Sequence, residues 1–404
     1  MDDKLPLEGI RVLELGHIVA GPSGSLLMAD MGADVIKVEN PQGGDQARSM
    51  PNRGGTFFFF NRNKRSLAVN LKTSTGREIF LALVKKSDVV IDNYSPGVLD
   101  GLGIGYKVAS EINPGIIYCS IKGFLPGPCE QRPLLDELAQ MQGGLAYMTG
   151  PVGQPLRAGA SIVDIGAATY GVLGVMAALY ERERTGRGRQ VQAGLFETVA
   201  FWVGQWMSVA AITGEVPLPM PARGMGGRMG WGVYQLFNAS DGRQVFIGAT
   251  SNAHWARLCK EFELMDLYED ESLNTNAKRV AQRQRVIPRV QEAVGRFTSK
   301  ELIDRLEHAQ IPYAPLNTPA DLLEDPHLNL GGYLMEISLP DERKVKLPSP
   351  PMNYGDFEYN VRYNPPKLGE HTREILSELG YSTEAIQQLV EQGVVGLESD
   401  YLFG

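Results

Sequence analysis

Residues 10–39, IRVLELGHIVAGPSGSLLMADMGADVIKVE, decide the fold. The segments 10–15 and 34–39 are rich in β-branched residues and are predicted to be strands, because such residues fit a pleated, partly buried surface. A turn at 17–22 and a short helix at 23–31 connect them. A strand, a helix and a second strand in this order form a βαβ unit, so we expect two parallel strands with a right-handed crossover.

The same alternation continues downstream. Further strands are predicted at 66–71, 88–92, 115–121 and 190–193, and helices at 75–86, 108–112, 134–142 and 195–211. This repeating pattern predicts an α/β fold with a doubly wound, mostly parallel sheet. Ligands bind such sheets outside the carboxyl ends of the strands, so we expect a crevice beside 16–22, 93–97 and 122–124.

A change of pattern marks a second, smaller domain. Prolines at 217, 219 and 221 and glycines at 224, 226 and 227 interrupt the earlier rhythm, as is typical of a linker and a glycine loop. Residues 234–250 then resemble a β-hairpin, and helices are predicted at 254–264, 277–298 and 299–309. An α+β domain is therefore expected near 225–315, followed by a tail with a helix at 370–379.

Composition narrows the class of function. The 404 residues suit two domains, and 43% hydrophobic with 21% charged residues is typical of a globular protein. The net charge of −8 argues against nucleic acid as a partner. Residues 61–86, with seven basic side chains and one acidic one, are expected to form a basic patch for a small anionic ligand.

The cysteines and histidines give no sign of a disulfide framework or a metal site, because three cysteines and five histidines are scattered along the chain. The N-terminal residues lack the apolar core of a signal peptide, and no uninterrupted apolar run reaches the roughly 18 residues of a membrane span. We therefore expect a cytoplasmic protein that does not contact membranes.

Residues 158–180, AGASIVDIGAATYGVLGVMAALY, predict a buried helix with a single carboxylate, Asp164, near its start. One interpretation is an N-cap, because an Asp oxygen accepts hydrogen bonds from the first free amides of a helix. The other is a nucleophile, because an ionised carboxylate stripped of water needs no partner base, and the small neighbours leave room for a ligand. The residues themselves leave both open.

Several short motifs match known functional sequences only in part. Residues 101–105, GLGIG, lack the last glycine of a dinucleotide-binding loop and are interpreted as a turn. Residues 21–25, GPSGS, have Ser25 where a nucleophile elbow needs glycine. The glycine-rich residues 223–232 are either a linker or a loop whose backbone approaches a ligand closely.

Taken together, the motifs resemble those of the class III CoA-transferases, the family of formyl-CoA transferase and carnitine CoA-transferase (the CaiB/BaiF family). The similar segments are LEGIRVLEL at 7–15, AGP at 20–22, GADVIKVE at 32–39, NRNKRS at 61–66, DNYSPG at 92–97, RTGRG at 184–188 and LGEHT at 368–372. Because they occur in fixed order across nearly the whole chain, they are more specific together than any one alone.

The resemblance implies an architecture and a reaction. It implies an interlocked homodimer in which a Rossmann-like large domain, 1–205 and 341–404, is joined by linkers at 206–224 and 316–340 to a small domain at 225–315. It also implies that Asp164 attacks an acyl-CoA thioester to form a mixed anhydride and then an aspartyl-CoA thioester. An acceptor carboxylate would reverse these steps and leave as a new acyl-CoA, with no tightly bound cofactor.

The resemblance also implies site residues. The positions expected to bind coenzyme A are His17, Val19, Ala20, Asn40, Lys72, Asn93, Tyr94, Gly101 and Arg132. Gly226 and Gly227 are expected to steady the oxyanion of the anhydride, and Gln140 and Arg228 to contact the acyl group. Asn40, Gly101 and Pro133 replace basic residues of the formyl-CoA branch, so Arg62, Arg65 or Arg132 would contact the phosphates instead.

Two rival functions and one substrate question stay open. An acyl-CoA racemase would need a histidine that is absent from the matching residues 134–136, and a non-catalytic CoA-binding subunit would not need Asp164. The missing insertion of the oxalate-using branch makes oxalate an unfavourable acceptor. A dicarboxylate such as succinate is favoured as the donor acid, because several side chains could bind its second carboxylate. These side chains are Arg157, Arg223, Arg228 and Trp231.

Overall fold

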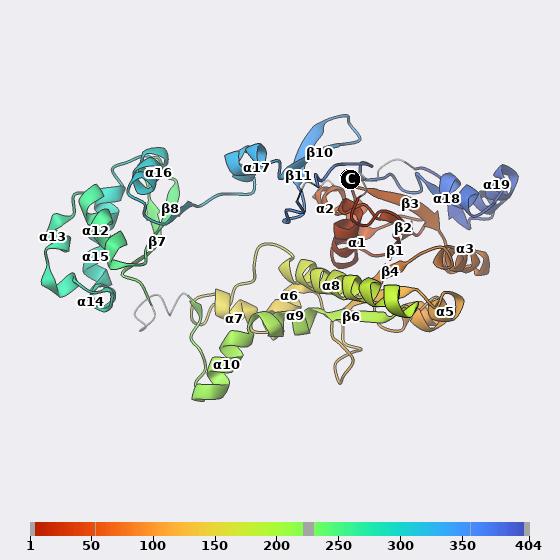
Figure 1. Cartoon of the computed structure of the whole chain (residues 1–404), viewed down its shortest axis with the longest axis horizontal. Helices are drawn as coiled ribbons and strands as arrows, with labels where there is room; N and C mark the ends of the chain where they lie inside the picture. The colour runs from red at the N-terminus through yellow and green to blue at the C-terminus, as the bar shows by residue number, and fades with distance from the viewer. Residues whose placement is uncertain (1–4, 53, 221–229, 356, 400–404) are drawn as a thin grey trace. The chain divides into compact units, whose positions relative to one another are not determined.

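The computed structural model describes residues 5–52, 54–220, 230–355 and 357–399. The chain divides into two compact units (Figure 1). The first unit comprises Met1–Leu145, Ala158–Met207 and Pro326–Gly404, and the second comprises Ala146–Arg157 and Ser208–Asp325.

A seven-stranded sheet with the order β12-β3-β2-β1-β4-β5-β6 forms the centre of the first unit. Its strands are β1 (Arg11–Leu15), β2 (Asp34–Glu39), β3 (Lys64–Val69), β4 (Val89–Asp92), β5 (Ile117–Lys122), β6 (Gln190–Gly194) and β12 (Val395–Gly396). All neighbouring strands pair in parallel except β12, which pairs with β3 in the antiparallel sense. The predicted α/β fold with a doubly wound, mostly parallel sheet is thus confirmed. The chain reverses direction across the sheet between β1 and β4, and this switch point is where such sheets bind ligands.

Helices cover both faces of this sheet because alternate strand residues point to opposite sides. On one face, Val12 and Ile91 pack with α1 (Ala20–Asp30) and α8 (Ile162–Thr185). On the other face the strands pack with the helices α3 (Ser74–Val84), α5 (Tyr106–Ile112), α18 (Thr372–Glu378) and α19 (Thr383–Glu391).

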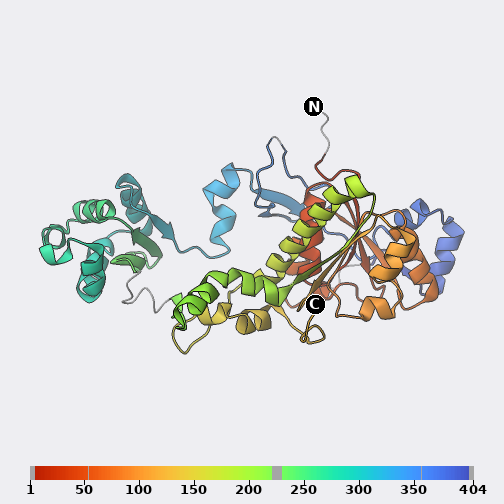
Figure 2. The same ribbon diagram turned by 60° about the horizontal axis from the view of Figure 1, so that its bottom comes forward.

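The small residues of α8 let it lie directly on the sheet, beside α1 (Figure 2). A Cβ atom at Gly171 would lie 3.0 Å from Cys119 Sγ, and one at Gly174 would lie 2.6 Å from Val191 Cγ1. Larger residues would therefore push the helix away from β5 and β6. By length and composition, α8 is also apolar enough to cross a membrane. The search for an uninterrupted apolar run in the sequence missed this helix because polar residues interrupt it. One face of α8 nevertheless belongs to the core of the first unit.

Some predicted elements have different limits. The first helix begins at Ala20 rather than Ser23, and an additional short helix, α7 (Leu145–Thr149), follows α6 in the sequence. The helix predicted at 195–211 is two helices, α9 (Leu195–Trp202) and α10 (Gly204–Thr213), with a 60° bend. The bend falls next to Gly204, and glycine is a common cause of such breaks.

Other elements of the first unit were not predicted. They are α2 (Gly55–Phe60), α4 (Val98–Gly101), α17 (Pro326–Leu330), α19, β12 and the hairpin of β10 (Leu334–Ser338) and β11 (Lys344–Pro348). The predicted helix at 134–142 is α6 (Asp136–Gln142), which begins two residues later than expected.

The second unit is built around a three-stranded antiparallel sheet. The predicted hairpin is confirmed as β7 (Val233–Asn238) and β8 (Gln244–Ala249), and β9 (Tyr313–Pro315) pairs with β8. The described helices that follow β7 in this unit include α12 (Asn252–Glu261), α13 (Met265–Tyr268), α14 (Asn276–Ala281), α15 (Arg283–Val294) and α16 (Ser299–His308). The single helix predicted at 277–298 is thus two helices separated at Gln282, whose φ of −111° and ψ of 26° are not helical.

Candidate active site

A cavity of about 610 Å³ opens at the carboxyl ends of β1, β4 and β5, where the topology places a ligand crevice. All of its lining residues belong to the first unit. The loop after β1 and the loop after β4 form part of its wall. The segment 131–137 and the first turn of α8 form another part, and Asp164 lies there.

Asp164 does not cap its own helix. It is the third residue after the N-cap position, which is Ser161, and its carboxylate accepts no hydrogen bond from the described part of the chain. Instead, Oδ2 of Asp136 accepts the backbone N–H groups of Val163 at 2.7 Å and of Asp164 at 3.1 Å. The cap interpretation of Asp164 is therefore wrong, because a carboxylate from another helix satisfies these amides.

Asp136 was not singled out from the sequence, although the structure makes it central. Its side chain is buried, and its second oxygen accepts a hydrogen bond from Nε2 of Gln140 at 2.6 Å. Gln140 Oε1 in turn accepts the N–H of Ala158 at 2.8 Å. Gln140 is fully buried and does not line the cavity, so the structure does not place it against an acyl group. Gln140 instead orients the side chain of Asp136 and the chain segment at Ala158 that leads into α8.

Burial and, to a lesser extent, the nearby charges of Asp136 and Glu137 together raise the pKa of Asp164 to about 7. A carboxylate in this position is poorly hydrated and repelled by its neighbours, so its ionised form is reactive. A strongly shifted pKa in a cleft is typical of a functional group. The geometry therefore favours the second interpretation of Asp164, a nucleophile.

Two loops of the cavity wall are bonded to each other at the switch point. The backbone N–H of His17 donates to Asn93 Oδ1 at 2.9 Å, and Asn93 Nδ2 donates back to the carbonyl of His17 at 3.0 Å. His17 Nε2 also lies 2.7 Å from the Tyr94 hydroxyl. Burial and the charge of Lys37 lower the pKa of His17, so its imidazole is neutral near pH 7. The two predicted coenzyme A loops are thus hydrogen-bonded to each other.

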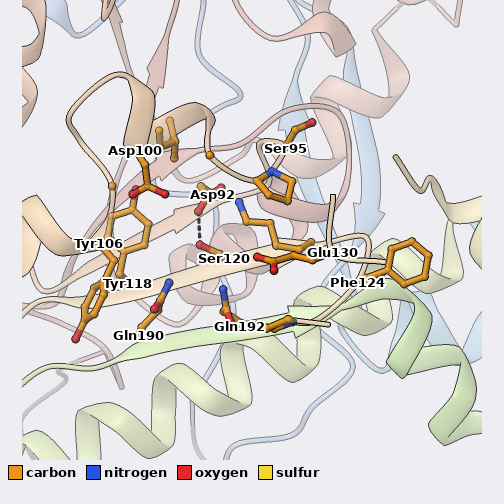
Figure 3. Close-up of a pocket in the computed structure, with 16 residues that line it drawn as sticks. Asp92, Ser95, Asp100, Tyr106, Tyr118, Ser120, Phe124, Glu130, Gln190 and Gln192 are labelled. Atoms are coloured by element: carbon orange, nitrogen blue, oxygen red, sulfur yellow. Dashed lines mark hydrogen bonds and ion pairs between the residues drawn. The ribbon is translucent and has the colours of Figure 1, made fainter. Parts of the chain in front are cut away.

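An ion pair at the ends of β4 and β5 holds Tyr94 in this arrangement. Lys122 Nζ bonds Asp92 and also donates to the carbonyl of Tyr94 at 2.7 Å, while Asp92 Oδ1 accepts the Tyr94 N–H at 3.0 Å. Asp92 also accepts a hydrogen bond from Ser120 at 2.5 Å, in a smaller cavity of about 90 Å³ (Figure 3). None of the predicted site residues lines that smaller cavity.

A third cavity, of about 300 Å³, shares Tyr94 with the first one. Asn40, Lys72 and Gly101, all predicted to bind coenzyme A, line it together with the ends of β2 and β3. The remaining predicted positions, His17, Val19, Ala20, Asn93 and Arg132, line the first cavity with Asp164. The structure therefore brings the predicted binding residues into two adjoining cavities, while Gly226, Gly227, Arg223 and Arg228 lie outside the described residues.

The prediction of a basic patch at 61–86 is wrong for two of its arginines, Arg62 and Arg65. Arg62 is 1% exposed and pairs with Asp30 at 2.6 Å. Arg65 is also buried and pairs with Asp34 at 2.7 Å, as well as with two glutamates of α18. Neither guanidinium can reach a phosphate in solution, because both are tied to carboxylates inside the fold. The sequence did not reveal these partners because they are distant along the chain.

Comparison with known proteins assigns the chain to a family. The family model described as CoA-transferase family III matches residues 7–372, and the chain belongs to this family. Mouse succinyl-CoA:glutarate CoA-transferase is 35% identical over 403 residues, covering 98% of this chain and 91% of that protein. Succinyl-CoA:mesaconate CoA-transferase of Haloarcula marismortui is 34% identical, covering 93% and 97%.

A solved structure supports the same assignment. The CaiB/BaiF family protein from Brucella suis superimposes with a TM-score of 0.83 and 32% identity, covering 93% of this chain and 99% of that chain. The resemblance found in the sequence is thus confirmed, and so is the prediction of a CoA-transferase enzyme.

Proposed function

We propose that the enzyme transfers coenzyme A from an acyl-CoA donor to a carboxylate acceptor through Asp164. The observation that carries this proposal is the carboxylate of Asp164, which lines the 610 Å³ cavity and forms no ion pair and accepts no hydrogen bond in the described chain. Such a group is held ready for attack rather than used for structure.

The proposed reaction requires no proton transfer. A carboxylate oxygen of Asp164 attacks the thioester carbonyl, and the C–S bond breaks to give a mixed anhydride and the coenzyme A thiolate. The thiolate attacks the aspartyl carbonyl and expels the donor acid as a carboxylate, which leaves an aspartyl-CoA thioester. The acceptor carboxylate then attacks this thioester and expels the thiolate. Attack of the thiolate on the acceptor's carbonyl releases the new acyl-CoA and restores Asp164.

The two adjoining cavities suggest how coenzyme A lies. The nucleotide end would occupy the 300 Å³ cavity beside Lys72, and the pantetheine arm would pass Tyr94 into the cavity with Asp164. Two cations line the cavity that holds Asp164: Lys122, which is bonded to Asp92, and Arg132. Arg132 forms no ion pair within the described residues; its guanidinium lies 5.7 Å from the Phe124 ring centroid.

Arg132 favours a dicarboxylate substrate, because a guanidinium can bind a second carboxylate through two parallel hydrogen bonds. The mouse and Haloarcula relatives, named for succinyl-CoA with glutarate and with mesaconate, support the same class. We therefore propose succinyl-CoA as the donor and a short dicarboxylic acid as the acceptor.

Incubation of the enzyme with succinyl-CoA and a panel of acids tests this proposal. New acyl-CoA, measured by chromatography, should form with glutarate or mesaconate and much less with butyrate. Arg132→Gln should raise KM for the dicarboxylate acceptor by roughly 10-fold or more, the usual loss for a charge-assisted bidentate contact, and leave KM for a monocarboxylate acceptor unchanged when succinyl-CoA is saturating. Equal KM increases for both acids would instead assign Arg132 to coenzyme A. Absence of any transfer, or exchange of the α-hydrogen alone, would contradict the function.

We also propose a homodimer, on the basis of an exposed apolar surface. Leu173 and Tyr180 of α8 are 64% and 70% exposed, and Phe201 of α9 is 73% exposed. Tyr170 connects the two helices, because its ring contacts Phe201. Apolar surfaces of this kind are usually covered by another protein chain. Light scattering should give twice the chain mass at micromolar concentration, and Leu173→Glu should shift the protein toward monomer; a monomeric wild-type protein would contradict the proposal.

A further inference from the structure

The loop between β1 and α1 carries a backbone conformation that needs outside support. Ile18 has a φ of +63°, a left-handed conformation that β-branched residues rarely adopt. Such conformations persist only where the surrounding structure enforces them, and they concentrate at functional sites. Ile18 lies between His17 and Val19, and all three residues line the cavity that contains Asp164.

The carboxylate of Asp45 supplies part of this support. Asp45 is fully buried and does not line the cavity. Its Oδ1 accepts the N–H of Ile18 at 2.9 Å and the N–H of Ala47 at 2.9 Å. Asp45 therefore connects the loop after β1 to the helical turn that directly follows Asp45 in the sequence. No other acceptor for the Ile18 N–H is present among the described residues.

Lys37 holds both Asp45 and the other side of the loop. Its ammonium group is fully buried and lies 2.8 Å from Asp45 Oδ2. It also donates to Glu14 Oε1 at 2.6 Å and to the carbonyl of Gly16 at 3.1 Å. Gly16 and Ile18, the residues on either side of His17, are therefore both hydrogen-bonded to the Lys37–Asp45 ion pair. The backbone of His17 itself is hydrogen-bonded to Asn93.

We propose that Asp45, together with Lys37, is a positioning residue that holds the loop 16–20 in its coenzyme A-binding conformation before the substrate arrives. This inference rests on the proposed function, because it assigns a role at the same site. Asp45 acts through Ile18 and His17 and touches no substrate. A loop that is already ordered does not lose conformational entropy on binding, so its order contributes directly to affinity.

The variant Asp45→Asn tests the proposal because it keeps the size of the side chain and removes the charge that binds Lys37. We expect Kd for free coenzyme A, measured by calorimetry, and KM for succinyl-CoA to rise by roughly 10- to 100-fold, as for a misplaced binding element. The kcat at saturating succinyl-CoA should change far less, because the loss is one of ground-state binding.

Asp30→Asn is the matched control. Asp30 is also a buried carboxylate paired with a buried cation, Arg62, but it lies at the opposite end of α1 and does not contact the loop. It should lower the stability toward urea and leave Kd for coenzyme A unchanged. Equal effects of the two variants on Kd, or no effect of Asp45→Asn, would overturn the inference while leaving the transferase function intact. A wild-type protein without transfer activity would instead overturn the proposed function.

A measurement on the wild-type protein covers the case in which Asp45→Asn fails to fold. Hydrogen exchange of a peptide containing residues 16–20 should be slow in the ligand-free protein and change little when coenzyme A is added. Complete exchange within seconds in the free protein, with protection only after coenzyme A binds, would show that the ligand and not Asp45 orders the loop.

Discussion

Replacing Asp164 with asparagine is expected to abolish CoA transfer and, at the same time, to make the protein more stable at pH 8. The loss of activity should be roughly 10⁴-fold or more, as is typical when a catalytic nucleophile is removed. Asparagine has nearly the same shape, but its amide does not attack a thioester. No partner interaction is lost in the folded protein, because the carboxylate accepts no hydrogen bond and forms no ion pair in the described chain.

The gain in stability follows from the sign of the pKa shift. The pKa of Asp164 is about 7 in the folded protein and near 3.8 in the unfolded chain, mainly because burial disfavours the charged form. The folded state therefore prefers the protonated side chain, and stability falls as the pH rises from about 4 toward 7. Asparagine is neutral throughout, so Asp164→Asn should gain up to a few kcal/mol above pH 7 and nothing near pH 4.

Urea unfolding at pH 8 and pH 4.5 measures this difference. Asp34→Asn provides a control of opposite sign, because Arg65 and Arg11 outweigh the effect of burial and hold the pKa of Asp34 below its usual range. That variant should be less stable than the wild type at pH 8. A loss of stability in Asp164→Asn at pH 8 would show that the carboxylate has a structural partner, against the present assignment.

The second large effect is expected from Asp136→Asn, which should move the pH dependence of catalysis. Only the ionised form of Asp164 attacks the thioester, so kcat/KM should rise tenfold per pH unit below about 7 and level off above it. Of the two nearby charges that raise the pKa of Asp164, Asp136 has the larger effect. Its asparagine variant keeps an oxygen that accepts the N–H of Val163 and removes the negative charge.

The midpoint of the acid limb should therefore fall by about one pH unit in Asp136→Asn, which corresponds to about 1.4 kcal/mol of lost repulsion. Glu137→Gln should shift it in the same direction by less, because Glu137 is the weaker of the two charges. Asp136→Leu separates the two roles, since it also leaves the amides of Val163 and Asp164 without an acceptor, at about 1–3 kcal/mol for a buried donor. An acid limb that stays in place in both Asp136→Asn and Glu137→Gln would contradict the electrostatic account.

The sequence was informative where function is carried by a local pattern. The βαβ alternation at 10–39 predicted the centre of the sheet, and the structure adds the strand order, with its switch point between β1 and β4. Asp164 was recognisable because it is the single charge at the start of a long apolar helix. The loops after β1 and β4 were found because βα loops at strand ends define the crevice.

The sequence was less informative where a residue acts through a distant partner. Asp136 accepts hydrogen bonds from the first turn of a helix that begins 26 residues downstream, and no periodic pattern in the sequence predicts this contact. Arg62 and Arg65 were interpreted as phosphate ligands because the sequence does not show that Asp30 and Asp34 reach them inside the fold. Asp45 was overlooked for the same reason, since its role depends on the left-handed conformation of Ile18.

The most direct test of the central claim is the mass of the intact protein after incubation with succinyl-CoA and rapid quenching in acid. We predict a covalent species heavier than the protein by coenzyme A less one water, located by peptide mapping at Asp164 and absent from Asp164→Asn. Transfer by the wild-type enzyme without such a species, or the same species in Asp164→Asn, would contradict the assignment of Asp164 as the nucleophile.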